Sequence, residues 1–259
     1  MATTATLEGV KKAVFFPFRG EKWGLKALIG SALLFACYII PIVPAIPMFG
    51  YFGQIMKRII LLDEDPEMPE WKDWGTLFLD GVKLFGATII YLLPALILTF
   101  GGYILFMVLD FSLAFSFSQV HSYSSSPFPL PTLLSGFGMF AGIAIAMIGM
   151  VLTYVCLIFV PPALGNMIAK GEFGAAFRAR EWWPIFKSNL SGYLLAVAIA
   201  LGLFSLMYLV GILFYASVVL CFLLPFVFGF VIFMAGAINF SLYAVAYRDS
   251  LKKLAIQAA

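Results

Sequence analysis

One long uncharged run of the chain, residues 192–247, places the strongest limit on its fold. About 20 apolar residues are enough for one helix to cross the hydrocarbon core of a bilayer. This stretch must therefore contain two crossings and the turn between them. The whole chain is 63% hydrophobic and 11% charged, whereas a soluble domain carries about 25% charged residues. These observations predict an integral membrane protein.

Three further apolar segments supply the remaining crossings, and proline residues interrupt the first of them. They are a hairpin at 24–56 and single crossings at 84–109 and 133–169. We therefore expect an all-α polytopic protein with six transmembrane helices, folded as a single membrane domain over residues 1–259.

The distribution of basic residues predicts how the chain is threaded. With six crossings, all sixteen Lys and Arg residues fall at the N-terminus, in the loops after the second and fourth crossings, or at the C-terminus. The opposite loops, at 42–46, 110–132 and 211–217, contain none. Since basic residues in short loops stay in the cytoplasm, we expect a cell-membrane protein with both termini cytoplasmic. The net charge of +3 then faces lipid headgroups, and no nucleic-acid-binding motif accompanies it.

An amphipathic helix is predicted from about Pro69, ahead of the crossing at 84–109. Apolar side chains recur there at three- and four-residue spacing, with charged and polar residues on the other side. Acids at Asp65, Glu67 and Glu70 are expected before or within its first turn, where the helix dipole favours negative charge. This helix should lie flat on the cytoplasmic surface before the chain turns into the membrane.

Two other segments, 7–23 and 173–186, follow the same plan ahead of the first and fifth crossings. Tryptophan favours the headgroup zone, where its ring is buried and its N–H stays hydrated. The tryptophans in these three segments are therefore membrane-interface candidates: Trp23, Trp71, Trp74, Trp182 and Trp183.

The three surface helices, each followed by a hairpin, predict an internal pseudo-threefold repeat. Its units cover about 7–58, 69–170 and 173–250. The segments that end the first two hairpins, "GQIMKR" and "GNMIAK", both place an amide four residues before a base. The alternative is that any cytoplasmic helix end attracts a base, since a short motif specifies little.

Several motifs resemble those of an uncharacterised prokaryotic membrane family, domain of unknown function 4013. They are "MPEWKDWGTLFLDGVKLFGATIIYLLPA" (68–95), "PPALGNMIAKGEFGAAF" (161–177) and "YAVAYRD" (243–249). The last departs from the family pattern, because Ala244 and Val245 stand where the family has a Gly-Gln pair. The resemblance implies a multi-span fold in a bacterial or archaeal membrane and no known activity.

The ionisable residues outside the cytoplasmic clusters do not form a recognisable catalytic or metal-binding set. Asp110 is interpreted as a helix-end carboxylate and His121 as an exposed loop residue without nearby acids or thiols. The acids at 63–67 lack the spacing of a calcium loop, so a solvated connector is favoured over a metal site. We therefore predict no enzyme activity, no metal and no cofactor.

Three amides on or near the crossings, Gln54, Asn166 and Asn239, are intramembrane polar candidates. Asn and Gln hydrogen-bond between helices, which favours a packing role over the lining of a shared cavity. In the far-side loop at 110–132, alternation of Phe or Leu with Ser or Ala over 111–118 predicts a strand or extended ribbon against the membrane.

Three functions are compatible with these features. The preferred one is a non-enzymatic scaffold or accessory subunit that contacts the lipid bilayer and a membrane partner or a second copy of itself. The alternative is a transporter or lipid-handling protein with a central cavity between the three hairpins. A surface enzyme that uses the acids at 63–80 is the least favoured.

Overall fold

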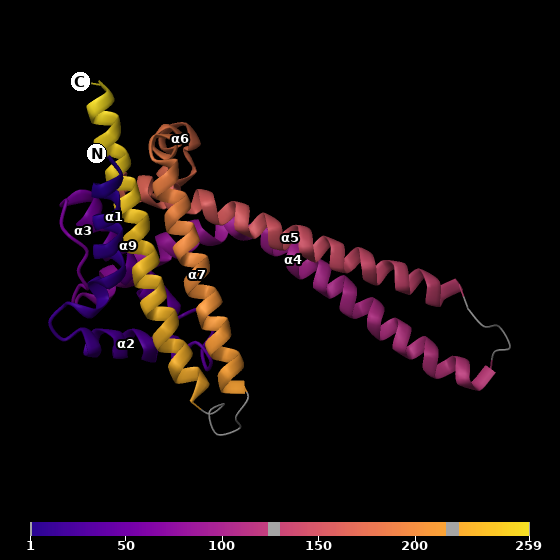
Figure 1. Cartoon of the computed structure of the whole chain (residues 1–259). Coiled ribbons are helices and arrows are strands. Elements are labelled where there is room, and N and C mark those ends of the chain that lie inside the picture. The colour runs from indigo at the N-terminus through magenta and orange to yellow at the C-terminus, as the bar shows by residue number, and fades with distance from the viewer. Residues whose placement is uncertain (1, 124–129, 216–222, 259) are drawn as a thin grey trace. The chain divides into compact units, whose positions relative to one another are not determined.

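The computed structural model describes residues 2–123, 130–215 and 223–258, and every regular element in these ranges is helical. Side chains are described for 8, 9, 11–115, 133–214 and 223–257. The prediction of an all-α protein is confirmed. The elements are α1 (Ala2–Phe15), η1 (Phe16–Phe18), α2 (Trp23–Ala36), α3 (Ala45–Leu61), α4 (Trp74–Tyr123), α5 (Leu130–Lys170), η2 (Phe173–Phe177), α6 (Ala179–Ser188), α7 (Leu190–Tyr215) and α9 (Leu224–Ala258) (Figure 1).

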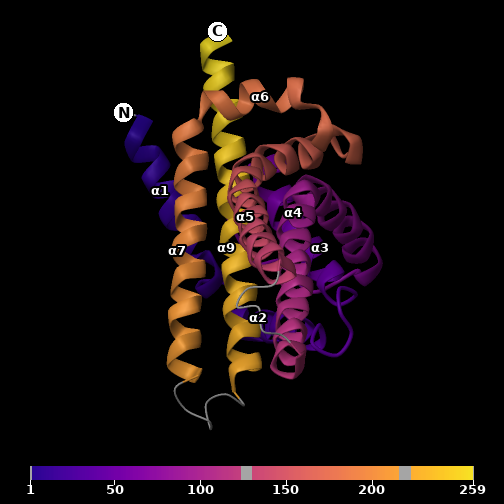
Figure 2. The same ribbon diagram turned by 90° about the vertical axis from the view of Figure 1, so that its right-hand side faces the viewer.

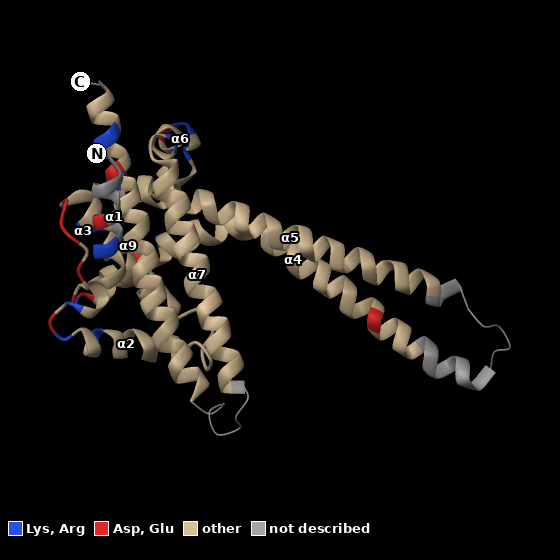
Figure 3. Cartoon of the chain, in the orientation of Figure 1, with Lys and Arg blue, Asp and Glu red and all other residues tan. Residues whose placement is uncertain are grey.

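The chain divides into two compact units. The main unit contains Met1–Thr88 and Ile158–Ala259, and the hairpin unit contains Ile89–Leu157. Helices α4 and α5 contribute to both. Nearly all charge belongs to the main unit, because Asp110 is the only Lys, Arg, Asp or Glu between residues 89 and 157 (Figure 3).

Helix α9 is the centre of the main unit. It contacts α1, α2, α3, α6 and α7, and α7 runs beside it along much of its length (Figure 2). The side chain of Phe233 is fully buried, with ring centroids 5.6 Å from Tyr51 and 5.7 Å from Phe52. A Cβ at Gly30 would lie 2.2 Å from the Phe233 ring, so a glycine in α2 makes room for this aromatic core.

Helices α3 and α4 approach each other backbone to backbone. A Cβ at Gly50 would lie 1.8 Å from the Leu77 carbonyl oxygen, and a Cβ at Gly81 would lie 1.9 Å from that of Ile46. No real Cβ fits at such distances, so both positions require glycine. The two glycines thereby fix where the helices cross.

The hairpin unit is held by the same kind of contact. A Cβ at Gly102 would lie 2.4 Å from the Ala146 nitrogen, and one at Gly149 would lie 2.4 Å from the Thr99 nitrogen. Likewise, a Cβ at Gly142 would lie 2.8 Å from the Phe106 nitrogen. Small residues allow this close approach of membrane helices. Gly101 differs, because nothing lies within 4 Å of a Cβ placed there.

Four helices in the described ranges are long and apolar enough to cross a membrane, namely α4, α5, α7 and α9. Helices α2 and α3 have 14 and 17 residues. At a rise of about 1.5 Å per residue they are about 21 and 26 Å long, shorter than a hydrocarbon core of about 30 Å. The predicted first hairpin is thus present as two helices with a break at 37–44, but the structure does not confirm six crossings.

The extended ribbon predicted over 111–118 is wrong. Helix α4 continues to Tyr123 and α5 begins at Leu130, while residues 124–129 lie outside the described ranges. Extending an existing helix gains one backbone hydrogen bond per residue, and a helix needs no partner strand in an apolar setting. The Ser112 hydroxyl bonds to the Val108 carbonyl oxygen at 2.8 Å, so the polar residue of the alternation is satisfied within the helix.

The separate surface helix predicted from Pro69 is also wrong, because α4 begins at Trp74 and runs without interruption into the hairpin unit. Asp73 precedes its first residue and accepts two hydrogen bonds from Thr76, from the backbone N–H at 3.3 Å and from the hydroxyl at 2.6 Å. These bonds lower the pKa of Asp73. The carboxylate that caps the helix is therefore Asp73 and not Asp65, Glu67 or Glu70.

The other two predicted surface segments are helical. Residues 7–18 lie in α1 and η1, residues 19–22 form a turn, and Trp23 begins α2, while residues 173–186 span η2 and most of α6. In α6 the side chains of Trp182, Ile185 and Phe186 are buried, whereas Arg180 and Lys187 are exposed. The protein thus covers one side of α6.

Candidate functional site

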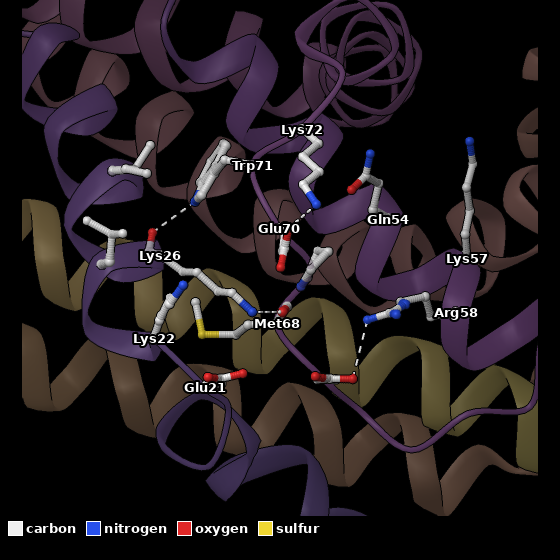
Figure 4. Close-up of a pocket in the computed structure, with 14 residues that line it drawn as sticks. Glu21, Lys22, Lys26, Gln54, Lys57, Arg58, Met68, Glu70, Trp71 and Lys72 are labelled. Atoms are coloured by element: carbon white, nitrogen blue, oxygen red, sulfur yellow. Dashed lines mark hydrogen bonds and ion pairs between the residues drawn. The ribbon is translucent and has the colours of Figure 1, made fainter.

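The main unit contains a cavity of about 770 Å³ between α2, α3 and the connector that precedes α4 (Figure 4). Its lining combines five basic and three acidic side chains with apolar ones. The residues are Glu21, Lys22, Leu25, Lys26 and Ile29 of or beside α2, Gln54, Lys57 and Arg58 of α3, and Glu67, Met68, Pro69, Glu70, Trp71 and Lys72 of the connector. Cavities of this size hold ligands as large as a drug molecule or a lipid headgroup.

The connector segment 68–71 is fixed to both helices by hydrogen bonds. The Lys26 ammonium donates to the Met68 carbonyl oxygen at 2.7 Å, and the Trp71 indole N–H donates to the Lys26 carbonyl oxygen at 2.9 Å. The buried Tyr51 hydroxyl donates to the Pro69 carbonyl oxygen at 2.8 Å. One wall of the cavity is therefore built from non-helical chain whose backbone groups are satisfied by α2 and α3.

Aromatic stacking holds the same wall from the other side. The Trp71 ring stacks on Tyr51, with centroids 4.1 Å apart and planes at 17°, and on Trp74 at 5.5 Å and 20°. Offset stacks of this kind add about 0.5–1.5 kcal/mol to the burial of the rings. The cavity therefore has an aromatic side, where the Trp71 ring is stacked, and a charged side.

The basic groups of the cavity differ in their partners. Arg58 forms ion pairs with Glu64 at 3.2 Å and Glu67 at 3.5 Å, Lys57 pairs with Asp80 at 2.6 Å, and Lys72 pairs with Glu70. In the part of the chain with described side chains, Lys22 and Lys26 form no ion pair. The Lys72 hydrogen bond lowers the pKa of Glu70, with smaller effects from Lys26 and Lys22. Two cationic groups of α2 thus lack a dedicated carboxylate.

The acids at 63–67 are solvent-exposed, with 45–68% of each side chain accessible, and they also have ion-pair partners. They form ion pairs with bases from three helices, and these pairs tie the connector to α1, α3 and α9. Asp63 bonds to Lys252 at 2.7 Å and lies 3.5 Å from Arg248, Asp65 pairs with Lys12 at 2.8 Å, and Glu64 and Glu67 pair with Arg58. The Lys252 hydrogen bond lowers the pKa of Asp63, with a smaller contribution from Arg248.

The five tryptophans all lie in the main unit, in different surroundings. Trp74 and Trp183 are 48% and 40% exposed, and Trp23, at 36%, packs edge-on against Phe18 at 5.5 Å. Trp182 is 5% exposed and donates its indole N–H to the Ala176 carbonyl oxygen at 3.0 Å. Trp71 lines the cavity. The placement of the five tryptophans in the membrane interface stays a prediction. The indole N–H groups of Trp182 and Trp71 both donate to backbone carbonyl oxygens within the protein.

The three predicted polar candidates do not come together in one site. Gln54 lines the cavity. Asn166 is 1% exposed and joins three elements: it donates to the Ala175 carbonyl oxygen at 2.8 Å and to Glu181 at 3.1 Å, and it accepts from the Tyr247 hydroxyl at 3.2 Å. Asn239 is 6% exposed, and its side-chain oxygen has no hydrogen-bond partner in the described part of the chain. The Asn166 side chain thus joins η2, α6 and α9, while the assignment of these amides as intramembrane groups stays a prediction.

Sequence reasoning missed Asn189, which lies between α6 and α7 and is 1% exposed. It donates to the Ala246 carbonyl oxygen at 3.2 Å and accepts from the Lys253 ammonium at 2.6 Å. Asparagine between two helical segments is a common capping residue, and this position in the sequence could have indicated a structural role for Asn189. The partners, 57 and 64 residues away, were not visible from local pattern.

The regular elements of the described ranges are all helical, four of these helices are long and apolar enough to cross a bilayer, and nearly all charge lies in one unit. These are the features of an α-helical membrane protein. The family described as "Protein of unknown function (DUF4013)" matches residues 33–216, which is more than half of the chain. The chain belongs to this family, as its motifs suggested. No curated protein and no solved structure matches it.

Proposed function

We propose that this protein is a non-enzymatic scaffold or accessory subunit of a bacterial or archaeal cell membrane. The observation that carries the proposal is the hairpin unit, which has its own close-packed interface and turns large apolar side chains outward. Among them Phe100, Met107, Phe140, Met147 and Val151 are 61–73% exposed. Apolar surface of this extent needs lipid or protein to cover it.

The proposed threading places both termini in the cytoplasm. With four crossings or six, all sixteen basic residues remain on one side, because the two arrangements differ only in the position of residues 37–44. The six-span version retains the three-unit repeat, and it requires residues 37–44 to reach the outer face. Labelling of a cysteine at Ile40 by an impermeant reagent in intact cells supports six crossings, whereas labelling only after lysis supports four.

The scaffold proposal is tested by photo-crosslinking in living cells from Phe100 and Met147 in the hairpin unit. We expect one stoichiometric product, either with a particular membrane protein or with a second copy of this chain. The product should persist in Gly101→Ala and decline in Gly102→Ala, since only the second substitution disturbs the interface within the hairpin. Products with lipid alone from both positions would contradict a scaffold role.

Lipid handling is the second candidate function, and the cavity between α2 and α3 is the observation that favours it. Gln54 lines this cavity, whereas Asn166 is committed to hydrogen bonds within the protein. Lipid exchange between labelled and unlabelled vesicles containing the purified protein tests this function. Exchange no faster than in protein-free vesicles would remove it.

A further inference from the structure

The apolar side of the cavity between α2 and α3 lies beside the N-terminal third of α9. The Trp71 ring on its wall is 6.0 Å from Phe233, and Gly30, one residue from the lining residue Ile29, touches the same ring. Further along, Phe35 of α2 stacks on Phe226 at 4.6 Å, close to the first residue of α9. Helix α2 therefore packs against the N-terminal third of α9.

This position sets the depth of the cavity along α9. Phe233 lies nine residues after Leu224 and fifteen before Arg248, so it is about 14 Å from the start of α9 and about 22 Å from its first charged residue. Helix α9 is one of the four helices able to cross a membrane. The lining residue Arg58 pairs with Glu64, whose carbonyl oxygen accepts a hydrogen bond from Arg248 at 3.4 Å, so the cavity also reaches the charged end of α9.

The chemistry of the lining selects the class of ligand. Lys22 and Lys26 lack ion pairs within the described part of the chain, while Glu67 and Glu70 are each paired with a base. Glu21 is the one lining carboxylate without such a pair among the described residues, so an excess of positive charge remains. Leu25, Ile29, Met68 and Trp71 give the same cavity an apolar side. Anion-binding and apolar surfaces side by side fit an amphiphilic anion.

We propose that this cavity binds the phosphate of an anionic phospholipid between Lys22 and Lys26. The glycerol and first acyl carbons then contact Leu25, Ile29 and Trp71. A phosphate diester supplies a full negative charge and several acceptor oxygens, which suit two ammonium groups. Basic pockets between membrane helices bind lipid headgroups by this chemistry. This site is independent of the scaffold role, because it uses none of the residues of the hairpin unit.

The test is native mass spectrometry of the full chain in detergent, titrated with phosphatidylglycerol, phosphatidylcholine or inorganic phosphate. We expect phosphatidylglycerol to bind and the other two not to compete. The double variant Lys22→Gln/Lys26→Gln should bind it roughly 30-fold more weakly. The control Lys11→Gln/Lys187→Gln removes the same charge outside the cavity and should retain the affinity of the native chain.

Because Lys26 also holds the connector, Lys22→Gln is tested alone. Its side chain makes no hydrogen bond in the described ranges, so it should keep the thermal unfolding midpoint and still lose affinity by roughly fivefold. Equal binding of phosphatidylcholine, full competition by inorganic phosphate, or equal losses in the control variant would each overturn the proposal.

Discussion

The main unit and the hairpin unit hold their helices together in different ways. In the main unit, aromatic rings interlock around Phe233, and ion pairs tie the connector at 63–72 to α1, α3 and α9. In the hairpin unit, one charged residue is present and the two helices meet at glycines. An apolar chain can thus use polar ties where it forms a cavity, and bare backbone contact where it presents its surface to lipid or a partner.

The largest effect is expected from Gly50→Ala in the main unit. Its Cβ would overlap the Leu77 carbonyl oxygen, so α3 and α4 must separate, and the free energy of unfolding should fall by about 3 kcal/mol. The matched control is Gly53→Ala in the same helix, where the nearest atom is 3.9 Å away. All five tryptophans belong to the main unit, so their fluorescence during detergent unfolding measures the change. Equal effects of the two substitutions would show that the crossing is not as close as described.

A smaller effect is expected from Gly102→Ala in the hairpin unit, where a single interface is strained. The distance between nitroxide labels at Met107 and Phe140 should lengthen and broaden, while tryptophan unfolding of the main unit should change by less than about 0.5 kcal/mol. Gly101→Ala is the control, since a Cβ there meets nothing within 4 Å. A large loss of main-unit stability in Gly102→Ala would contradict the division into two units.

The sequence predicted the helices well and their partners poorly, for physical reasons visible in particular residues. Hydrophobic run length located α4, α5, α7 and α9, because a helix that crosses the bilayer needs about 20 apolar residues. The alternation of apolar and small polar residues at 111–118 gave a wrong prediction of a strand, because the continuation of α4 outweighs a local strand preference.

Partners that are distant in sequence could not be predicted, because local patterns carry no such information. The ion pair of Asp63 joins residues 189 positions apart. Part of the site was visible all the same: Gln54 and Trp71 were candidates, and both line the cavity. Lys22 and Lys26 were counted as topology markers, since nothing local showed that α2 and the connector enclose a space between them.

The smallest effect is expected from acid, and it should be confined to the main unit. The depressed pKa of Asp63 means that its ion pair with Lys252 contributes stability above the ordinary carboxyl pKa and loses it as the pH falls through the lowered value. A nitroxide at Leu62, in a chain whose three native cysteines are replaced by serine, should become more mobile below about pH 4. Asp63→Asn should be mobile at all pH values, and a label at Phe100 in the hairpin unit should not respond. A pH response at Phe100 of the same size would contradict the assignment to Asp63.

The central claim is that the hairpin unit presents its apolar surface to the membrane interior while the charged connector is in water. Nitroxides at Phe100, Met147 and Leu62 in lipid nanodiscs test it through collision rates with oxygen, which concentrates in lipid, and with a water-soluble nickel chelate. The account predicts that oxygen collisions dominate at Phe100 and Met147 and nickel collisions dominate at Leu62. Nickel-dominated relaxation at both hairpin positions would contradict it.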